Sequence, residues 1–285
     1  MIITQSSCGT LRDCPKMYRL KYIEGWKAKE TYESLLFGTL WHKIKEMEAL
    51  HRPPSAIAAF VASNADNETT AIKLTVMHKE HRKRRVCALP QGVELRFEYP
   101  LYNPDSGRPA KQAIVSGVID GLLYENGEWW IVEYKTASQI NGSYITRISL
   151  DFQVHLYKLC ASRLYGINIV GVIYDVIKKP TIRQKQKETL LEYEQRLHEW
   201  YADNSAEAFY AQPVLLQDRD VERQVWMYYQ ELLWRSRNDY WPRNTNQCMN
   251  HYGRQCQFFG YCDSGDKEHV LRQDFEQREI HPELK

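Results

Sequence analysis

The sequence predicts an α/β protein with a mixed central sheet flanked by helices. Three segments rich in β-branched and aromatic residues, separated by the turn signals NPDSG and ENG, have the pattern of an antiparallel meander. A segment of helical period and then a short apolar run with the pattern of a buried strand follow the meander. With a helix expected ahead of them, the core order is α, β, β, β, α, β: residues 34–50, 93–102, 113–124, 128–136, 150–166 and 167–177.

The first helix is expected at 34–50, because Leu36, Leu40 and Ile44 recur at helical spacing. More helix is expected after the Pro-Pro break, ending in the basic run 78–85. Gly166 is a natural stop for the helix at 150–166. Beyond Glu188 the sequence predicts helix through 191–211 and 221–239, and then a loop-like tail from Pro242 with three cysteines. We expect one domain over 1–285, composed of a helical part (1–92), a sheet core (93–187) and a second helical part (188–285).

Composition describes an ordinary soluble globular protein. Of 285 residues, 43% are hydrophobic and 26% charged, and the formal net charge is only +2. A nucleic-acid site would therefore depend on local basic patches. No apolar run is long enough to span a membrane and no signal sequence is evident, so we expect a cytoplasmic protein without a membrane partner. In that compartment the seven cysteines are free thiols or metal ligands.

Three charged residues in the predicted hairpin require an explanation, since buried charges are costly unless paired or bound to metal. Glu133 and Lys135 share one face of their strand, and Asp120 lies on the partner strand. Two carboxylates suit Mg²⁺ or Mn²⁺, and a lysine can assist a metal-bound water and balance charge on a phosphate. This is equipment for phosphodiester hydrolysis, although a Glu-x-Lys surface ion pair is the simpler alternative.

Asp120 followed by Glu133-Tyr134-Lys135 resembles the signature of the PD-(D/E)XK nuclease superfamily. The resemblance implies a restriction-endonuclease-like fold, with Asp120, Glu133 and the backbone carbonyl of Tyr134 as ligands of Mg²⁺ or Mn²⁺. FGTLWHKIKE resembles the Gly-Thr-x-x-His element of RecB-like members, which implies that His42 is a further ligand.

DFQVHLYKL resembles the Gln-x-x-x-Tyr element of the same RecB-like subgroup. Gln153 and Tyr157 are four residues apart and so share one helical face. The resemblance implies that both support the site without binding the metal. Ordinary packing of Tyr157 is the alternative.

The cysteines Cys14, Cys248, Cys256 and Cys262 resemble those of the AddB-like and CRISPR-associated relatives, in which one N-terminal and three C-terminal cysteines hold a [4Fe-4S] cluster. A Cys₄ Zn²⁺ site and unconnected thiols are alternatives, and Cys8 competes with Cys14 for the first position.

Two basic runs are candidate DNA-binding surfaces: Arg82 and Arg84 in the first, and Lys178, Lys179, Arg183 and Lys185 in the second. The resemblance implies an exonuclease that prefers single strands. An endonuclease on branched or phage DNA and a catalytically silent binding module are alternatives. No G-x-x-x-x-G-K-[ST] loop occurs, so unwinding would need a helicase or recombination partner. Besides DNA and such a partner, the protein could bind further copies of itself as a homo-oligomer, which the sequence neither requires nor excludes.

Overall fold

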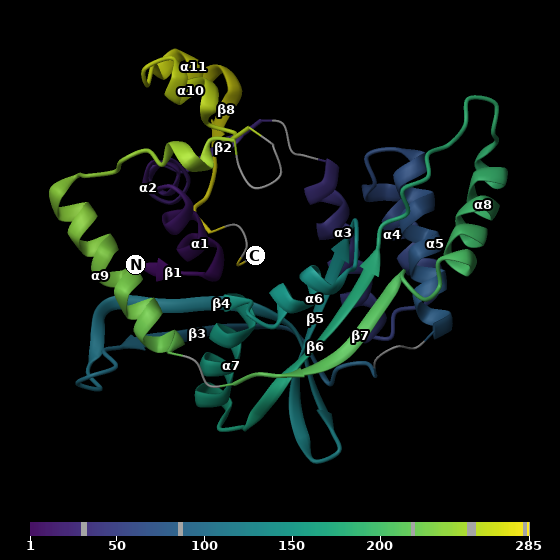
Figure 1. The fold of residues 1–285 in the computed structure, drawn as a ribbon, viewed down its shortest axis with the longest axis horizontal. Coiled ribbons are helices and arrows are strands. Elements are labelled where there is room, and N and C mark those ends of the chain that lie inside the picture. The colour runs from purple at the N-terminus through teal and green to yellow at the C-terminus, as the bar shows by residue number, and fades with distance from the viewer. Residues whose placement is uncertain (30–32, 85–87, 218–219, 250–254, 282–283, 285) are drawn as a thin grey trace. The chain divides into compact units, whose positions relative to one another are not determined.

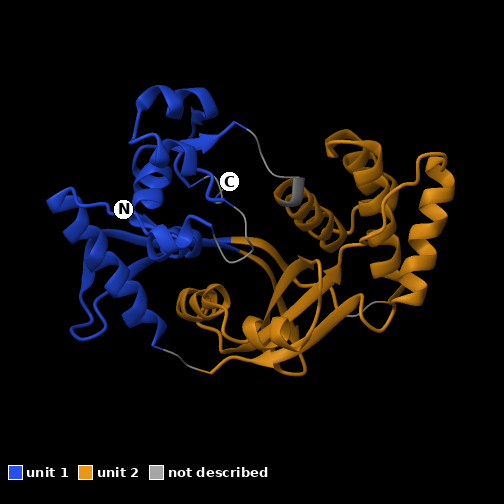
Figure 2. Ribbon diagram, turned by 45° about the horizontal axis from the view of Figure 1, so that its top comes forward, with its two compact units in different colours: residues 1–31, 96–118, 219–285 blue, residues 32–95, 119–218 orange. Residues whose placement is uncertain are grey.

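A computed structural model describes the chain except for residues 30–32, 85–87, 218–219, 250–254, 282–283 and 285. The described chain forms two compact units, each assembled from separate stretches of sequence (Figure 2). Unit 1 comprises residues 1–31, 96–118 and 219–285, and unit 2 comprises 32–95 and 119–218. The boundaries cut through two strands, so β3 and β4 each contribute residues to both units.

The helices and strands follow one another along the chain as Figure 1 shows. The helices are α1 (Gln5–Asp13), α2 (Pro15–Tyr18), a π-helical segment (Arg19–Ile23), α3 (Glu33–Ala49), α4 (Pro54–Asn64), α5 (Glu68–Arg84), α6 (Gly142–Ile148), α7 (Phe152–Tyr165), α8 (Leu190–Asp203), α9 (Val221–Asn238), a 3₁₀ turn (Thr245–Gln247), α10 (Phe259–Asp263) and α11 (Glu268–Asp274). The strands are β1 (Ile2–Ile3), β2 (Trp26–Ala28), β3 (Gly92–Tyr102), β4 (Pro109–Glu125), β5 (Glu128–Ala137), β6 (Ile169–Lys178), β7 (Phe209–Leu215) and β8 (Phe275–Gln277).

The sheet of unit 2 has the strand order β4, β5, β6, β7. The hairpin of β4 and β5 is antiparallel, with Gly121 opposite Val132. Helix α7 then carries the chain over to β6, which runs parallel to β5 with Glu133 opposite Tyr174. Such a parallel return requires a crossover, which is why a helix separates these two strands in sequence.

Helix α7 is limited at both ends by its own sequence. The Asp151 side chain accepts a hydrogen bond from the Gln153 backbone N–H, which caps the first turn. Gly166 has φ of 65° and ends the helix in the left-handed conformation that glycine adopts without strain. Gln153 therefore lies in the first turn of α7, within hydrogen-bond distance of two side chains of β5.

A second layer of unit 2 consists of α3, α4, α5 and α8, which bury a shared apolar core. Trp41 and Ile44 from α3 pack with Leu74 and Met77 from α5, all almost fully buried. Ile177 of β6 belongs to the same cluster, so the core joins these helices to the sheet. This packing fixes α3, the helix that carries His42, against the strands.

Unit 1 is built around a different set of contacts. Strand β1 pairs in parallel with the first half of β4 through Ile2 and Ile114, and β2 pairs with β8 in a small antiparallel ribbon. Two apolar clusters hold its segments together: Leu11, Tyr18, Tyr22, Leu232 and Trp241 in one, and Leu20, Phe258, Leu271 and Phe275 in the other.

The predicted core order α, β, β, β, α, β is confirmed, and its six elements correspond to α3, β3, β4, β5, α7 and β6. The predicted helix over 191–211 is wrong in its last part. Helix α8 ends at Asp203, and Phe209–Leu215 forms β7, which supplies the free edge of β6 with an antiparallel partner. The tail after Pro242 is also more ordered than expected, since it includes α10, α11 and β8.

Candidate active site

Asp120 and Glu133 come together because β4 and β5 form a hairpin. Gly121 pairs with Val132. In an antiparallel pair the neighbouring residues farther from the turn, Asp120 and Glu133, then lie opposite each other. The Asp120 Oδ2 atom accepts a hydrogen bond of 2.9 Å from the backbone N–H of Tyr134. Both carboxylates are buried, and Glu133 is fully inaccessible. The two acidic groups therefore meet in a region of low dielectric.

Lys135 lies on the same side of β5 as Glu133, and its Nζ atom donates to Glu133 Oε1 at 2.5 Å. Burial lowers the pKa of Lys135, but the Glu133 carboxylate outweighs it and keeps this pKa above its ordinary value. Lys135 therefore remains an ammonium ion across the physiological range. In that form it can donate hydrogen bonds and balance negative charge, but it cannot accept a proton.

Gln153 contacts both charged groups of β5 from the first turn of α7. Its Nε2 atom donates to Glu133 Oε1 at 2.8 Å, and its Oε1 atom accepts from Lys135 Nζ at 3.3 Å. The amide thus orients the carboxylate and the ammonium at the same time. Sequence reasoning named Gln153 as a supporting residue, and the structure places it in direct contact with the pair.

Tyr157, one turn further along α7, is buried. Burial raises the pKa of Tyr157, and the carboxylates of Glu133 and Asp120 raise it further. Its phenol therefore stays protonated next to the acidic groups, while a hydrogen bond with Gln153 acts weakly in the opposite direction. Tyr157 contacts the positioning amide and belongs to the helix core at the same time.

His42 reaches the hairpin from α3. Its Nδ1 atom lies 3.2 Å from the carboxylate oxygens of Asp120. Burial lowers the pKa of His42, but the Asp120 carboxylate outweighs it, and the net shift is upward. The His42 ring and the Asp120 carboxylate therefore bind each other in this structure. A bound divalent cation would separate them and take both side chains as its ligands.

One atom of this site has no hydrogen-bond partner in the described chain. Glu133 Oε1 receives bonds from both Lys135 and Gln153, whereas Glu133 Oε2 is buried and receives none. Burial raises the pKa of Glu133 to about 7 against the opposing effect of Lys135. A hard divalent cation would satisfy the vacant oxygen and restore the charge of the carboxylate. The donor set of carboxylates, imidazole and backbone carbonyl fits Mg²⁺ or Mn²⁺.

The side chains are not already gathered into a coordination sphere. Within the described parts of the chain, no group of three or more His, Cys, Asp or Glu side chains is arranged to hold a metal ion. At the acidic site the reason is visible, since Lys135 and Gln153 both bind the one Glu133 oxygen and His42 pairs with Asp120.

A buried charged network behind β5 escaped the sequence analysis. The His81 Nε2 atom of α5 lies 2.7 Å from Asp175 Oδ1 of β6, and Lys45 Nζ of α3 lies 3.2 Å from His81 Nδ1. Lys45 also lies over the ring of Tyr134, 5.0 Å from its centroid. The signal that could have revealed the network is Asp175 inside the apolar run VIYDVI, the same kind of anomaly that singled out Asp120.

The basic residues proposed for DNA contact all belong to unit 2. Lys179 directly follows β6, and its backbone N–H donates to Ala137 O at the carboxyl end of β5, two residues beyond Lys135. The first run is less exposed than expected, because His78, Glu80 and His81 are buried within it. Arg82 and Arg84 lie near Glu48 and the Phe209 ring respectively. Lys178 is the last residue of β6, and Arg183 and Lys185 lie in the segment between β6 and α8.

The four cysteines proposed for the cluster are half-buried and belong to unit 1. The Cys256 backbone N–H donates to Cys248 O at 2.7 Å, and the Asn244 N–H donates to Cys14 Sγ at 3.5 Å. Burial raises the pKa of Cys256, and nearby Cys14 and Cys248 raise it further. These three thiols thus share one neighbourhood.

Cys262 and Cys8 differ in their surroundings. Burial raises the pKa of Cys262 to about 11, and Cys256 is among the neighbours that raise it further, so Cys262 lies near Cys256. Burial raises the pKa of Cys8 to about 12, which describes an enclosed, unreactive thiol. Cys14 is therefore the better first member of the set.

No helix in the described chain is long and apolar enough to cross a lipid bilayer. A carboxylate pair and a lysine on adjacent strands, with a histidine from α3, are the side chains of an α/β phosphodiester hydrolase. A family model for the PD-(D/E)XK nuclease superfamily matches residues 2–263. The chain belongs to this superfamily, and its fold is the restriction-endonuclease-like core.

Among solved structures, the chain is similar to a candidate exonuclease from Eubacterium rectale, with a TM-score of 0.50 and 9% sequence identity over 87% of this chain and 85% of that one. This likeness shows the fold. The protein SSO0001 aligns with a TM-score of 0.35 at 15% identity, over 81% of this chain and 76% of that one. No curated protein matches the sequence.

Proposed function

We propose that this protein is a Mg²⁺- or Mn²⁺-dependent deoxyribonuclease that acts as an exonuclease on DNA ends, with preference for single strands. The observation that carries the proposal is Glu133, a fully buried carboxylate with one oxygen that no group in the described part of the chain satisfies. The exonuclease part is supported by the likeness in fold to the candidate exonuclease from Eubacterium rectale. Superfamily membership supports the hydrolytic part.

His42, Asp120, Glu133 and the Tyr134 carbonyl would hold the metal ion. A bound divalent cation would polarise the phosphate and lower the pKa of water. Lys135, as an ammonium, would orient the attacking water and balance charge that develops on the phosphate. Gln153 would hold Lys135 and Glu133 in register, and Tyr157 would support Gln153. Because its pKa is raised, Lys135 would stay protonated and would not act as a general base.

The proposal extends to the DNA path. The second basic run starts where β6 ends, next to the carboxyl end of β5, so a strand with its phosphate at Lys135 could continue along Lys178 and Lys179 toward Arg183 and Lys185. Arg82 and Arg84 are a second, separate candidate surface. The chain would need a partner to unwind duplex DNA, as a helicase does.

The test is digestion of end-labelled linear single-stranded DNA, linear duplex and a closed circle by anaerobically purified protein in Mg²⁺ and in Mn²⁺. We expect degradation of linear DNA, faster for single strands, and its loss in Lys135→Ala. Lys73→Ala removes a lysine of the same unit that lies outside the site and outside both basic runs, and it serves as the matched control. Cutting of the circle would instead show an endonuclease. DNA binding without any cutting would show a silent module.

The proposal includes a [4Fe-4S] cluster on Cys14, Cys248, Cys256 and Cys262 as a structural group, with Zn²⁺ as the alternative. Thiolates are good ligands for either metal, and Cys256 lies near Cys14, Cys248 and Cys262, although no three described side chains are already arranged around a metal site. Anaerobically purified protein should be brown with absorbance near ~400 nm, and Cys256→Ser should remove the colour. A colourless protein that contains zinc would favour the alternative, and Cys160→Ser, a buried thiol of unit 2, is the control.

A further inference from the structure

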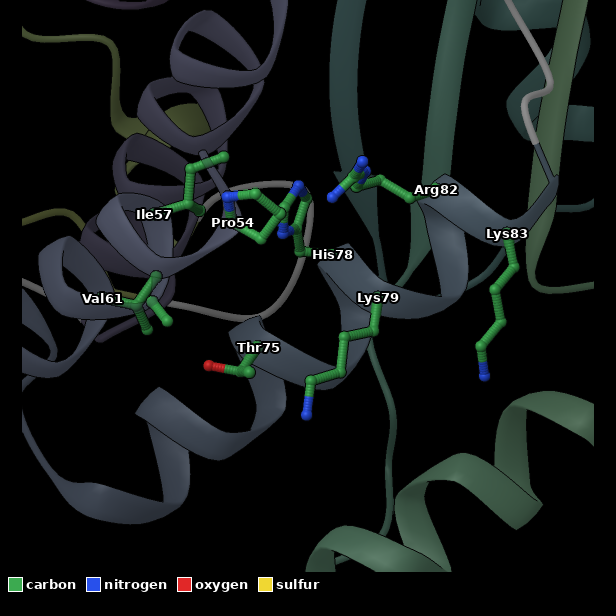
Figure 3. A pocket seen from close by; sticks show the side chains of 9 residues that line it. Pro54, Ile57, Val61, Thr75, His78, Lys79, Arg82 and Lys83 are labelled. Carbon is green, nitrogen blue, oxygen red and sulfur yellow. The ribbon is translucent and has the colours of Figure 1, made fainter. Parts of the chain in front are cut away.

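A pocket between α4 and α5 is separate from the carboxylate site. It has a volume of about 430 Å³ and is lined by Pro54, Ile57, Ala58, Val61, Thr75, His78, Lys79, Arg82 and Lys83. Figure 3 shows Pro54, Ile57 and Val61 on the α4 side facing Thr75 and His78 on the α5 side. This volume is within the range of small-molecule sites. The pocket is therefore large enough for a ligand of nucleotide size.

His78 is the buried polar group of this pocket. It is 6% exposed, and its Nε2 atom has no hydrogen-bond partner in the described chain. The nearest acidic atom, Glu48 Oε1, lies 4.0 Å away, beyond hydrogen-bond distance. Burial lowers the pKa of His78 to about 4, so the imidazole is neutral at physiological pH. In this structure Nε2 is itself covered, so a turn of the ring would bring this unsatisfied nitrogen to the pocket, where the polar, uncharged edge of a ligand could satisfy it.

The walls and the rim of the pocket differ in character. Ile57, Ala58 and Val61 form an apolar wall on α4. Lys79, Arg82 and Lys83 form a cationic rim on α5, and Figure 3 shows the Arg82 side chain extending back toward His78. The pocket thus offers an apolar wall, the polar group of His78 and a cationic rim. A ligand that matches these three features has a flat apolar body, a hydrogen-bonding edge and an anionic group.

The rim cations are not locked by their present partners. Lys79 pairs with Glu194 and Lys83 with Glu80, while Arg82 Nε lies 3.6 Å from Glu48. The side chains of Lys79, Arg82 and Lys83 are 50%, 47% and 64% exposed. Glu194, the partner of Lys79, is itself 30% exposed, so this pair contributes little and Lys79 can exchange it for a phosphate. Glu48 and Glu80 are only 13% and 9% exposed, but they keep Lys45 and His198 as partners when Arg82 or Lys83 turns to a phosphate.

Arg82 also lines an adjoining pocket of about 620 Å³, which His51 and Arg52 border as well. The two pockets share Pro54, Ile57 and Arg82. The Arg82 guanidinium thus lies between the apolar part of the α4–α5 pocket, called the apolar slot below, and the second, more polar pocket, which has further cationic side chains. Arginine at such a junction suits bidentate contact with a phosphate.

We infer that the α4–α5 pocket binds a nucleotide, with the base in the apolar slot against His78 and the phosphate on Arg82. The choice of a nucleotide among ligands of this chemistry rests on the proposed nuclease function. Two sources share this chemistry: a free nucleoside monophosphate, which hydrolysis of DNA releases, and a nucleotide within a DNA strand.

The test uses the full chain without divalent metal, so that no DNA is cut. Binding of 2′-deoxyadenosine 5′-monophosphate is measured by calorimetry, and binding of a fluorescein-labelled oligodeoxyadenylate by anisotropy. Ala58→Trp fills the slot. Ala59→Trp is the matched control, since Ala59 is the exposed neighbour on the same helix and does not line the pocket. His78→Leu removes the polar edge and retains the bulk of the side chain.

We expect Ala58→Trp and His78→Leu each to weaken binding by about tenfold or more, with Ala59→Trp unchanged. This pattern for the mononucleotide identifies the free nucleotide as the ligand, and the same pattern for the oligonucleotide alone identifies the strand. Equal affinity in all variants, or no binding of either probe, overturns the inference. Circular dichroism confirms that each variant is folded.

The failure of this inference is distinguishable from failure of the proposed function. Hydrolysis of linear DNA is measured with the same preparations in Mn²⁺. Hydrolysis that Lys135→Ala abolishes, with nucleotide binding unaffected by Ala58→Trp, leaves the nuclease proposal standing and removes the pocket. If Ala58→Trp abolishes nucleotide binding and no substrate is hydrolysed, the pocket proposal stands and the nuclease proposal is removed.

Discussion

Gln153 is the side chain that holds the reactive pair of β5 together, because it donates to Glu133 and accepts from Lys135. Gln153→Ala leaves both groups charged but free to rotate. We expect kcat on linear DNA to fall by about 10–100-fold with little change in KM, as for residues that orient metal ligands. Gln195→Ala, on the outer part of α8, should leave both constants unchanged. A fall in KM alone would contradict a positioning role.

The pKa of Glu133 makes metal binding sensitive to pH. Burial raises this pKa to about 7, and a cation binds only the ionised form. Mn²⁺ affinity should therefore increase as pH rises from about 6 to about 8, with release of a proton in the lower part of this range. Calorimetry in two buffers of different ionisation enthalpy measures the proton. Equal affinity at both pH values would refute the prediction, and Glu133→Gln should remove the binding.

Asp175 stabilises the helical layer of unit 2 through its contact with His81 and its proximity to Lys45. Burial raises the pKa of Asp175, but His81 outweighs it, so the net pKa is below the ordinary value. The ion pair therefore stabilises the fold above the unfolded-state pKa of about 3.9, and this stability is lost as pH falls through the lower folded-state pKa.

Asp175→Asn leaves two buried basic groups without their carboxylate. We expect the free energy of unfolding to decrease by about 3–5 kcal/mol at neutral pH, and this deficit to shrink below about pH 4. Denaturant unfolding at both pH values measures it. Glu207→Gln interrupts an exposed ion pair with Lys178 and should change stability by less than about 1 kcal/mol. A pH-independent deficit would show that the charge is irrelevant.

The close packing of β6 between its neighbours depends on Gly171. A Cβ atom there would lie 2.4 Å from Val214 O of β7 and 2.7 Å from a ring carbon of Trp130. Gly171→Ala should therefore lower the free energy of unfolding by about 1–3 kcal/mol. In contrast, Gly142→Ala places a methyl group in open space at the start of α6 and should be neutral or stabilising. Thermal melts of both variants measure the difference.

At the level of elements, the sequence predicts well where a pattern is local and poorly where a partner decides. The hairpin β4–β5 and helix α7 were predictable, because turn residues, Asp151 and Gly166 specify them within their own segments. Strand β7 was not. AFYA is compatible with helix, and only the unpaired edge of β6 selects the extended form.

The same distinction separates the parts of the candidate site. Asp120, Glu133 and Lys135 are recognisable because they are charges in strands that otherwise read as buried. The role of His81 could not be predicted. It lies in a run of basic residues that reads as a solvated surface, and its burial follows from the packing of α5 against β6.

The units share strands, and this bears on how the whole molecule unfolds. Because β3 and β4 each supply residues to unit 1 and unit 2, neither unit can lose its share of the sheet without disturbing the other unit's strand. We expect one unfolding transition by scanning calorimetry, with equal calorimetric and van't Hoff enthalpies, in accord with the predicted single domain. Two resolved transitions would contradict this.

The interleaved boundaries also order events during protein synthesis. Unit 2 ends at residue 218, so every residue of the carboxylate site has been translated before the ribosome reaches Cys248. Unit 1, by contrast, needs residues from the first segment and from 219 onward. All residues of the candidate hydrolytic site are therefore present in the nascent chain while the cysteine set is still incomplete. A metal group at the cysteines, as proposed above, would thus be added only after all the proposed catalytic residues have been translated.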